Sequence, residues 1–468
     1  MELDPILLSR IQFAFVVSFH AIFPVFTIGL AAFVAFLETL GYRTGDPLYV
    51  RLSKFWIKVF AVVFGMGVVS GIVMAFQFGT NWSNFSQATA NFMGPILSYE
   101  VVTAFFLEAA FLGILLFGRG KVPSGIYLFS AYMVAVGTFI SSFWILSANS
   151  WMQTPAGVEM VDGMYRVTSW TAAIFNDSLA PRFVHMALAS FLTGAFVVSA
   201  VSAWFLLRGR EVEANRKALS MSLWLLLIIA PAQLLVGDWH GLNTLEHQPT
   251  KVAAMEGNWE TSRNVPLLLF AIPDQANQTN HWEVGIPGLA SLILKHDMDG
   301  EVPGISAVPR DEQPPVGIVF WAFRLMVTIG LVMIAFALTG AWLRRGDRYW
   351  RTPWFLKGLT WMGITPFIAV LAGWFVTEVG RAPWLIYGEM TYVQGVTPSL
   401  TGGMALFSLI GYIVVYAVVF AAGVYYLLRL FRGGLEADEE TAEHHEVERA
   451  KRPFSAAHVS FDDAEVNK

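Results

Sequence analysis

Nine long apolar runs constrain this chain more than any other feature of its sequence. Each run is at least as long as the roughly 20 residues that a helix needs to cross a hydrocarbon core of about 30 Å. Backbone groups cannot stay unpaired in lipid, so an open chain crosses a bilayer as helices. We therefore predict an all-α polytopic membrane bundle of about nine transmembrane helices. The runs lie near 11–38, 55–78, 95–117, 124–147, 183–207, 218–237, 316–343, 355–377 and 402–430.

The composition agrees with a membrane protein and excludes several other classes. The chain is 55% hydrophobic and only 14% charged, whereas a soluble globular chain carries about 25% charged residues. Its formal net charge of −5 and the lack of a basic patch argue against nucleic-acid binding. Cysteine is absent from the sequence, which excludes disulfides, thiolate-bound iron–sulfur clusters and a cysteine nucleophile.

The distribution of Lys and Arg predicts the orientation of the bundle. Basic residues gather in the loops that follow the first, third, fifth and seventh runs, and are sparse on the other side. The positive-inside rule places the basic loops in the cytoplasm, with the N-terminus outside and the C-terminus cytoplasmic. The clusters are Arg43, Arg51, Lys54 and Lys58; Arg119 and Lys121; Arg208, Arg210, Arg216 and Lys217; and Arg344, Arg345, Arg348 and Arg351.

Four regions follow from this layout. Residues 1–237 hold the first six transmembrane helices, and residues 316–432 hold the last three. Between them, residues 238–315 form a long outer loop. Residues 433–468 form an acidic cytoplasmic tail, which we predict to be disordered because it is rich in charge and poor in apolar residues.

Ionisable side chains inside the apolar runs are the first candidates for function. A charged group at the centre of a transmembrane helix costs about 2.5–3.5 kcal/mol, so one that is present needs a reason. Acids and bases occur at seven such positions: His20, Glu100, Glu108, His185, Arg324, Glu378 and Arg381.

Histidine and methionine in these runs could bind a metal. His20 precedes Pro24 by four residues, and a proline there removes the hydrogen bond to the carbonyl of residue 20 and kinks the helix. His20 could be a metal ligand or be bonded to a neighbouring helix. His185 and Met326 come from different runs and could clamp a heme iron, although Met326 alone fits packing better. Arg324 needs an anionic partner, and a heme propionate would serve.

Two pairs of charged residues could handle protons. Glu100 and Glu108 are eight residues apart, a rotation of about 80° on a regular helix, so they share a broad face. They could pass protons, or anchor another subunit. Glu378 and Arg381 are spaced i, i+3 and could pair with each other. Alternatively, Glu378 could bind iron or donate a proton to a buried cofactor.

Lys251 and Glu256 lie in the outer loop, where a short amphipathic helix could rest on the membrane surface. A cation and a carboxylate could bind and deprotonate a phenolic headgroup, but the residues alone favour an ordinary solvated face. Of nine histidines, only His20 and His185 fall inside the predicted spans. This is too few for a heme-copper oxidase. A small-molecule transporter stays open, although paired broken helices are not evident.

Several segments, in order, resemble subunit I of the cytochrome bd quinol oxidases, and the resemblance runs from about residue 8 to about residue 430. The segments are FQFGTNW at 76–82, WILSANSWMQ at 144–153, FVH at 183–185, IPDQ at 272–275, FRLM at 323–326 and GWFVTEVGR at 373–381. The short outer loop resembles the branch that includes cyanide-insensitive oxidases. Ala382 departs from the usual Gly-Arg-Gln-Pro-Trp pattern.

The resemblance implies a role for each candidate. His185 and Met326 would hold a low-spin heme b, which Arg324 would tune. His20, Glu378 and Glu100 would supply iron ligands to a high-spin heme b and to the oxygen-reducing heme, a heme d or a third heme b. Glu108, with Glu100, would form a proton route, and Lys251 and Glu256 would take part in quinol oxidation. Arg381 would contact the cofactor, and Trp374 would lie between hemes.

The resemblance also implies a reaction and partners. The complex would sit in the bacterial cytoplasmic membrane, oxidise quinol at the outer side and reduce O2 to water with cytoplasmic protons, building proton-motive force without pumping. A second polytopic subunit would accompany the chain, with a small single-span accessory subunit in some relatives. The alternatives are a heme-bearing electron-transfer subunit that does not reduce O2, and the transporter named above.

Overall fold

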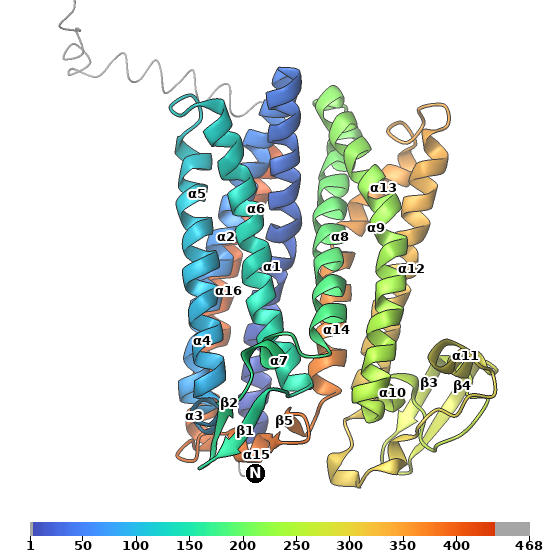
Figure 1. Ribbon diagram of the computed structural model, residues 1–468. Coiled ribbons are helices and arrows are strands. Elements are labelled where there is room, and N and C mark those ends of the chain that lie inside the picture. The colour runs from blue at the N-terminus through green and yellow to red at the C-terminus, as the bar shows by residue number, and fades with distance from the viewer. Residues whose placement is uncertain (1–2, 436–468) are drawn as a thin grey trace, which may run out of the picture.

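The computed structural model describes residues 3–435, so nearly all of the predicted disordered tail lies outside the described residues. Within them, nine helical spans run side by side as a bundle (Figure 1), which confirms the all-α membrane fold. The spans are α1 (Pro5–Thr44), α2 (Pro47–Thr80), α4 with α5 (Ala90–Glu100, Phe106–Phe117), α6 (Ser124–Gln153), α8 (Leu179–Leu206), α9 (Val212–His247), α12 (Val316–Arg344), α13 with α14 (Pro353–Met362, Thr365–Val379) and α16 (Gly402–Gly433).

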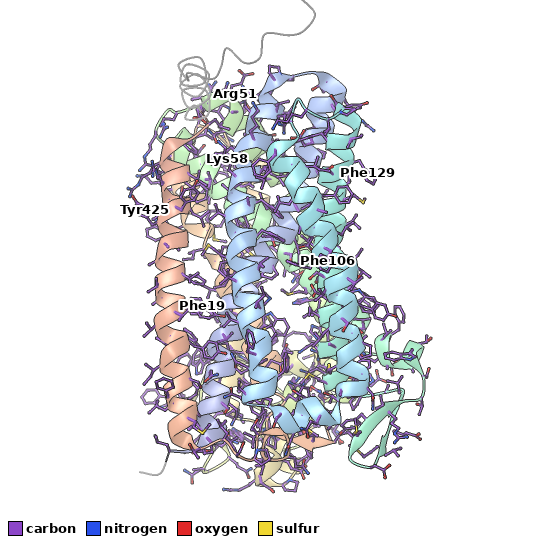
Figure 2. All side chains as sticks on the ribbon, turned by 90° about the vertical axis from the view of Figure 1, so that its left-hand side faces the viewer. Phe19, Arg51, Lys58, Phe106, Phe129 and Tyr425 are labelled. Atoms are coloured by element: carbon purple, nitrogen blue, oxygen red, sulfur yellow. The ribbon has the colours of Figure 1, made fainter. Side chains whose placement is uncertain are left out.

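The two ends of the bundle differ in character. One end carries the basic loops, and Figure 2 shows Arg51 and Lys58 near it. The other end carries short elements that the apolar pattern did not predict, among them three antiparallel hairpins (Figure 1). These are α3 (Ser83–Ala88), β1 (Val158–Val161), β2 (Met164–Val167), α7 (Trp170–Ile174), α10 (Pro249–Glu256), β3 (Leu267–Asp274), β4 (Thr279–Ile286), α11 (Leu289–Lys295), η2 (Ile305–Ala307), η3 (Arg310–Glu312), β5 (Trp384–Ile386), β6 (Met390–Thr391) and α15 (Tyr392–Gly395).

Local sequence signals fix the first helical hairpin. Asp4 caps α1 by accepting a hydrogen bond from the backbone of Ile6 at 2.8 Å, and Asp46 caps α2 in the same way through Leu48 at 2.9 Å. Gly45 ends α1 in the left-handed conformation, which glycine adopts without a steric penalty. The turn between the first two predicted spans is therefore set by two adjacent residues, Gly45 and Asp46.

Close helix packing depends on small residues, as is usual where lipid surrounds the helices. Gly29 of α1 and Gly194 of α8 face each other, and a Cβ at Gly194 would lie 3.0 Å from the Cα of Gly29. The apolar residues around this crossing are buried with those of α2 and α6. The crossing of α1 and α8 holds together the two halves of the bundle that carry His20 and His185.

Three spans differ from their predicted form. Helix α9 continues to His247, well past residue 237, so His240 lies in a helix and not in the outer loop. The third span contains a π-helical segment, η1 (Val101–Phe105), between α4 and α5. The eighth span breaks between α13 and α14. Each difference alters where a candidate side chain points, because the apolar run by itself reports only length.

Candidate functional site

A buried network of charged and amide side chains lies where α6, α10 and the end of α14 meet. The carboxylate of Glu378 accepts hydrogen bonds from Asn149 at 2.9 Å and from Gln153 at 3.1 Å. Arg381 also donates to it, so the pairing predicted from the i, i+3 spacing is present. A carboxylate with three donors is held in one orientation.

Lys251 of α10 enters the same network. Its Nζ donates to Oε1 of Gln153 at 2.7 Å, and its side chain passes over Gly380, where a Cβ would lie 2.8 Å from Cγ of Lys251. Burial lowers the pKa of Lys251 well below its usual value, and the nearby cations Arg182 and Arg381 lower it further. The interpretation of this segment as a solvated surface helix is wrong, because every residue from 251 to 256 is buried.

The network holds more positive than negative charge, and part of it is unsatisfied. Nε and Nη1 of Arg381 and Nε of Arg182 are buried and have no hydrogen-bond partner among residues 3–435. A buried guanidinium N–H without an acceptor is costly even when the rest of the group is paired. Nε1 of Trp374, one turn before Glu378 on α14, is also a buried donor without a partner in the same range. This donor set fits a cofactor with carboxylate groups, such as the propionates of heme.

His185 lies on α8 and faces α9. The side-chain amide of Gln233 lies 3.3 Å from Nε2 and 3.4 Å from Nδ1 of His185. The ring of His240 packs edge to face against it, with ring centroids 5.4 Å apart. The sequence analysis placed His240 in the outer loop and so did not predict this contact.

Met326 and Arg324 leave α12 in different directions, because two residues along an α-helix are about 200° apart around its axis. The sulfur of Met326 faces α14, where a Cβ at Gly373 would lie 3.0 Å from it. Arg324 turns toward α10. It donates to Glu256 at 3.0 Å and to the carbonyl of Leu268 at 2.9 Å. The anionic partner that Arg324 needs is therefore Glu256.

His20 lies on α1 opposite α2. Its Nδ1 is 3.0 Å from Oγ of Ser70, and that hydroxyl donates its own proton to the carbonyl of Gly67 at 2.9 Å. Ser70 must therefore accept from Nδ1–H, which leaves Nε2 as the bare nitrogen. A histidine whose second nitrogen is held in this way is oriented for an axial metal bond. The two sequence interpretations of His20, ligand and interhelical contact, are compatible.

Glu100 and Glu108 lie closer to one face than a regular helix would place them. Between them η1 adds a residue to one turn, so Glu108 takes the angular place of the seventh residue after Glu100, about 20° away. The predicted 80° is wrong because it assumed an unbroken α-helix. Ser141 of α6 donates to Glu100 at 2.7 Å, and a Cβ at Gly137, one turn away, would lie 2.6 Å from Cγ of Glu108.

Five candidate side chains share one packing feature: each lies against a glycine of a neighbouring element. A β-carbon at that position would crowd the functional group, so the glycine provides the space that it occupies. The pairs are His20 with Gly71, Glu108 with Gly137, His185 with Gly237, Met326 with Gly373 and Lys251 with Gly380.

Sequence reasoning missed several members of the site. Arg182 directly precedes the predicted run 183–207, yet it is buried and close enough to Glu378 to interact with it electrostatically. Asn149 and Gln153 lie in a segment that carried the resemblance, but they follow the predicted run 124–147 and carry no charge, so they were not singled out. Their four-residue spacing, which puts them on one face of α6, was the available signal.

A family model identifies the class of protein to which this buried site belongs. The family model for cytochrome bd terminal oxidase subunit I matches residues 8–435. The chain belongs to this family. The resemblance and the enzyme class expected from the sequence are thereby confirmed. Membership also makes the chain a multi-pass subunit of a heme-containing respiratory oxidoreductase.

Individual relatives agree along nearly their whole length. The chain is 36% identical to cytochrome bd ubiquinol oxidase subunit 1 of Bacillus subtilis, covering 97% of this chain and 98% of the relative. It is 32% identical to cytochrome bd-II ubiquinol oxidase subunit 1 of Escherichia coli, covering 93% and 98%. The solved bd oxidase structure from Geobacillus thermodenitrificans has a TM-score of 0.86 at 32% identity, covering 92% of this chain and 99% of that one.

Proposed function

We propose that this chain is the catalytic subunit of a bd-type oxidase that oxidises quinol at the outer side and reduces O2 to water with cytoplasmic protons. The observation that carries the proposal is the set of buried guanidinium N–H groups beside Glu378, on Arg381 and Arg182, that have no hydrogen-bond acceptor among residues 3–435. Such groups are stable in a membrane interior only with an anionic cofactor in place. The bound hemes would supply the electron-transfer and oxygen-reducing chemistry.

The ligand assignments follow the orientation of each side chain. His185 of α8 and Met326 of α12 would hold a low-spin heme b. His20, Glu378 and Glu100 would serve the high-spin heme b and the oxygen-reducing heme, a heme d or a third heme b. Support comes from Ser70, which leaves one nitrogen of His20 bare, and from the three donors that hold Glu378.

Quinol would be oxidised where α10 meets α12. Glu256 would accept a proton from the quinol hydroxyl, and the bond from Arg324 would hold its carboxylate in place. Lys251 points away from Glu256 and into the network around Glu378, so its contribution would be positive charge next to the cofactor. The two residues would therefore act on opposite faces of α10.

Glu100 and Glu108 would carry protons inward from the basic end of the bundle. Both carboxylates face α6, and Oε1 of Glu108 has no partner among the described side chains and backbone. An acid without a fixed partner can exchange its proton with water or with the next carboxylate. Glu100, nearer the hairpin end, would receive the proton from Glu108.

Orientation completes the proposal. The basic loops would face the cytoplasm, which places α10 and the hairpins outside. Protons from quinol would leave on the outer side and protons for water would enter from the inner side, so charge separation alone would build proton-motive force. The complex would lie in the bacterial cytoplasmic membrane with subunit II, and with a small accessory subunit in some assemblies.

Purification of the assembled complex tests the proposal. We expect a Soret band, a low-spin heme b signal, carbon monoxide binding by a high-spin heme, and quinol-dependent O2 consumption. The electron-transfer alternative predicts low-spin heme without carbon monoxide binding. The transporter alternative does not apply to a member of a terminal oxidase family. A colourless complex containing both subunits would overturn the proposal.

A further inference from the structure

The hairpin of β3 and β4 exposes large apolar side chains. Its buried side packs on the bundle, where Leu268 and Ala271 contact Phe320 of α12. In water, the other side of a two-stranded antiparallel sheet normally carries polar residues. Six large apolar side chains of the two strands are instead between 42% and 80% exposed, and we call them the hairpin patch: Leu269, Phe270, Ile272, Trp282, Val284 and Ile286.

Irregular strand pairing brings these side chains to the surface. The register shifts between Leu268 and Phe270, and again between Phe270 and Ile272. A bulge of this kind re-aims side chains that strict alternation would send to opposite faces. Leu269 and Phe270 are therefore both exposed although they are neighbours in the chain.

The polar side chains of β4 have partners within the hairpin. Oε1 of Glu283 accepts a hydrogen bond from Asn280 at 2.8 Å, and Nε2 of His281 lies 3.3 Å from the carboxylate of Asp274. These groups do not need a polar partner from another molecule. What the patch offers to its surroundings is mainly apolar surface.

The hairpin is fixed beside a transmembrane helix. Nε of Arg324 donates to the carbonyl of Leu268 at 2.9 Å, and the ring of Phe270 meets that of Trp321 with centroids 5.2 Å apart. Trp321 is five residues into α12, which is about 7.5 Å along the helix from Val316. Figure 1 shows the hairpin standing out sideways from the bundle beside this end of α12.

This position is the depth at which interfacial elements rest. Such elements bury an apolar face about 5–10 Å into the boundary between headgroups and acyl chains. The exposed side of α12 continues the hairpin patch, because Ile318, Trp321 and Leu325 follow at spacings of three and four residues and all are exposed. Tryptophan is enriched at membrane–water interfaces, and Trp282 of the patch is the most exposed of the six.

We propose that the hairpin patch inserts into the bilayer at the headgroup boundary of the leaflet next to this end of the bundle. The occupant is phospholipid, because the patch is continuous with the exposed face of a transmembrane helix and is held at interfacial depth. The hairpin thereby anchors the 238–315 segment to the membrane surface between its two covalent ends. An apolar surface of this kind on a segment outside the spans marks a site of contact.

The test uses the absence of cysteine from the sequence. Trp282→Cys and Val284→Cys each place one thiol of this chain in the patch, and Thr279→Cys places a control thiol at the exposed start of β4. The complex with subunit II is labelled in phospholipid nanodiscs with a water-soluble maleimide. We expect the patch thiols to react at least about tenfold more slowly than the control, since drawing one large apolar side chain out of lipid costs that much. Equal rates would overturn the proposal.

A second measurement identifies what covers the patch. A benzophenone attached to the thiol of Trp282→Cys is irradiated in the same nanodiscs, and the adducts are resolved by mass. Phospholipid adducts on this chain support the proposal. A crosslink to subunit II or to a second copy of this chain, or a lack of lipid adducts, would overturn it. If Trp282→Cys does not assemble, Val284→Cys serves for both measurements.

Discussion

Arg324 of α12 and Glu256 of α10 form an ion pair at 3.0 Å, with side chains only 10% and 6% exposed. Arg324 also donates to the carbonyls of Met255 and Leu268, so one guanidinium joins the last turn of α10 to strand β3. The position of the proposed quinol-binding carboxylate therefore depends on a residue of a transmembrane helix.

Removing Arg324 should destabilise this region strongly. Arg324→Met leaves Glu256 buried and unpaired, which typically costs about 3–5 kcal/mol. We expect a lower midpoint of thermal unfolding and a raised KM for quinol. The double variant Arg324→Met, Glu256→Met should recover part of the lost stability, because no charge is left unpaired. Equal stabilities of the single and double variants would show that the pair is not coupled.

Met326→Leu should remove the low-spin heme signal, since leucine offers no sulfur ligand but fills a similar volume. The measurement is the reduced-minus-oxidised spectrum of the assembled complex. Met333→Leu, a change at a buried methionine of the same helix, should leave that spectrum unaltered. A normal low-spin band in Met326→Leu would exclude the sulfur as a ligand.

Glu108 can be perturbed directly or through its neighbour. Glu108→Gln should slow O2 reduction at least about tenfold, the order expected when a positioned proton-transfer group is lost, with KM for quinol unchanged. Gly137→Ala should act in the same direction, because the added methyl group would crowd the Glu108 side chain. Gly125→Ala, on α6 with open space around it, is the control. Normal turnover in Glu108→Gln would rule out a proton route through this carboxylate.

Lys251→Ala should raise the apparent KM for quinol about tenfold to a hundredfold, because the hydrogen bond from Lys251 to Gln153 anchors the helix that carries Glu256. A lost charge-assisted hydrogen bond costs about 1.5–3 kcal/mol. The change also removes one of the cations that would balance the cofactor, so we expect weaker heme retention. Lys295→Ala on α11, where the side chain is exposed, should change neither property. An effect seen only with artificial electron donors would place quinol binding elsewhere.

Asp274 at the β3–β4 turn should make the hairpin sensitive to acid. Hydrogen bonds from Asn277 and then from His281 lower its pKa from 3.8 to about 2. Because the folded-state pKa is the lower one, the stabilisation is fully present above about pH 4 and is lost as the pH falls toward 2. Hydrogen exchange of 267–286 should accelerate over that interval in the parent protein and be uniformly faster in Asp274→Ala. An identical pH profile in the two proteins would contradict this.

Sequence patterns predicted the site residues that are charged although their surroundings in the sequence are apolar. His20, Glu108, Arg324 and Glu378 stood out because charge is rare in apolar runs. Gln233 and Asn149 did not stand out, because a neutral amide carries no net charge that requires a counterion, and its partner is on another helix. Lys251 was misjudged because a short polar helix has the same pattern whether it faces water or a buried network.

The sequence by itself determined that this chain crosses a membrane as a helical bundle, since the length of an apolar run and the cost of unpaired backbone in lipid are local properties. Only the tertiary structure decided that Glu100 and Glu108 are about 20° apart instead of about 80°, that Lys251 reaches Gln153, and that His240 meets His185. These relationships depend on helix register, on one π turn and on where α9 ends, and each is set by packing between segments distant in the chain.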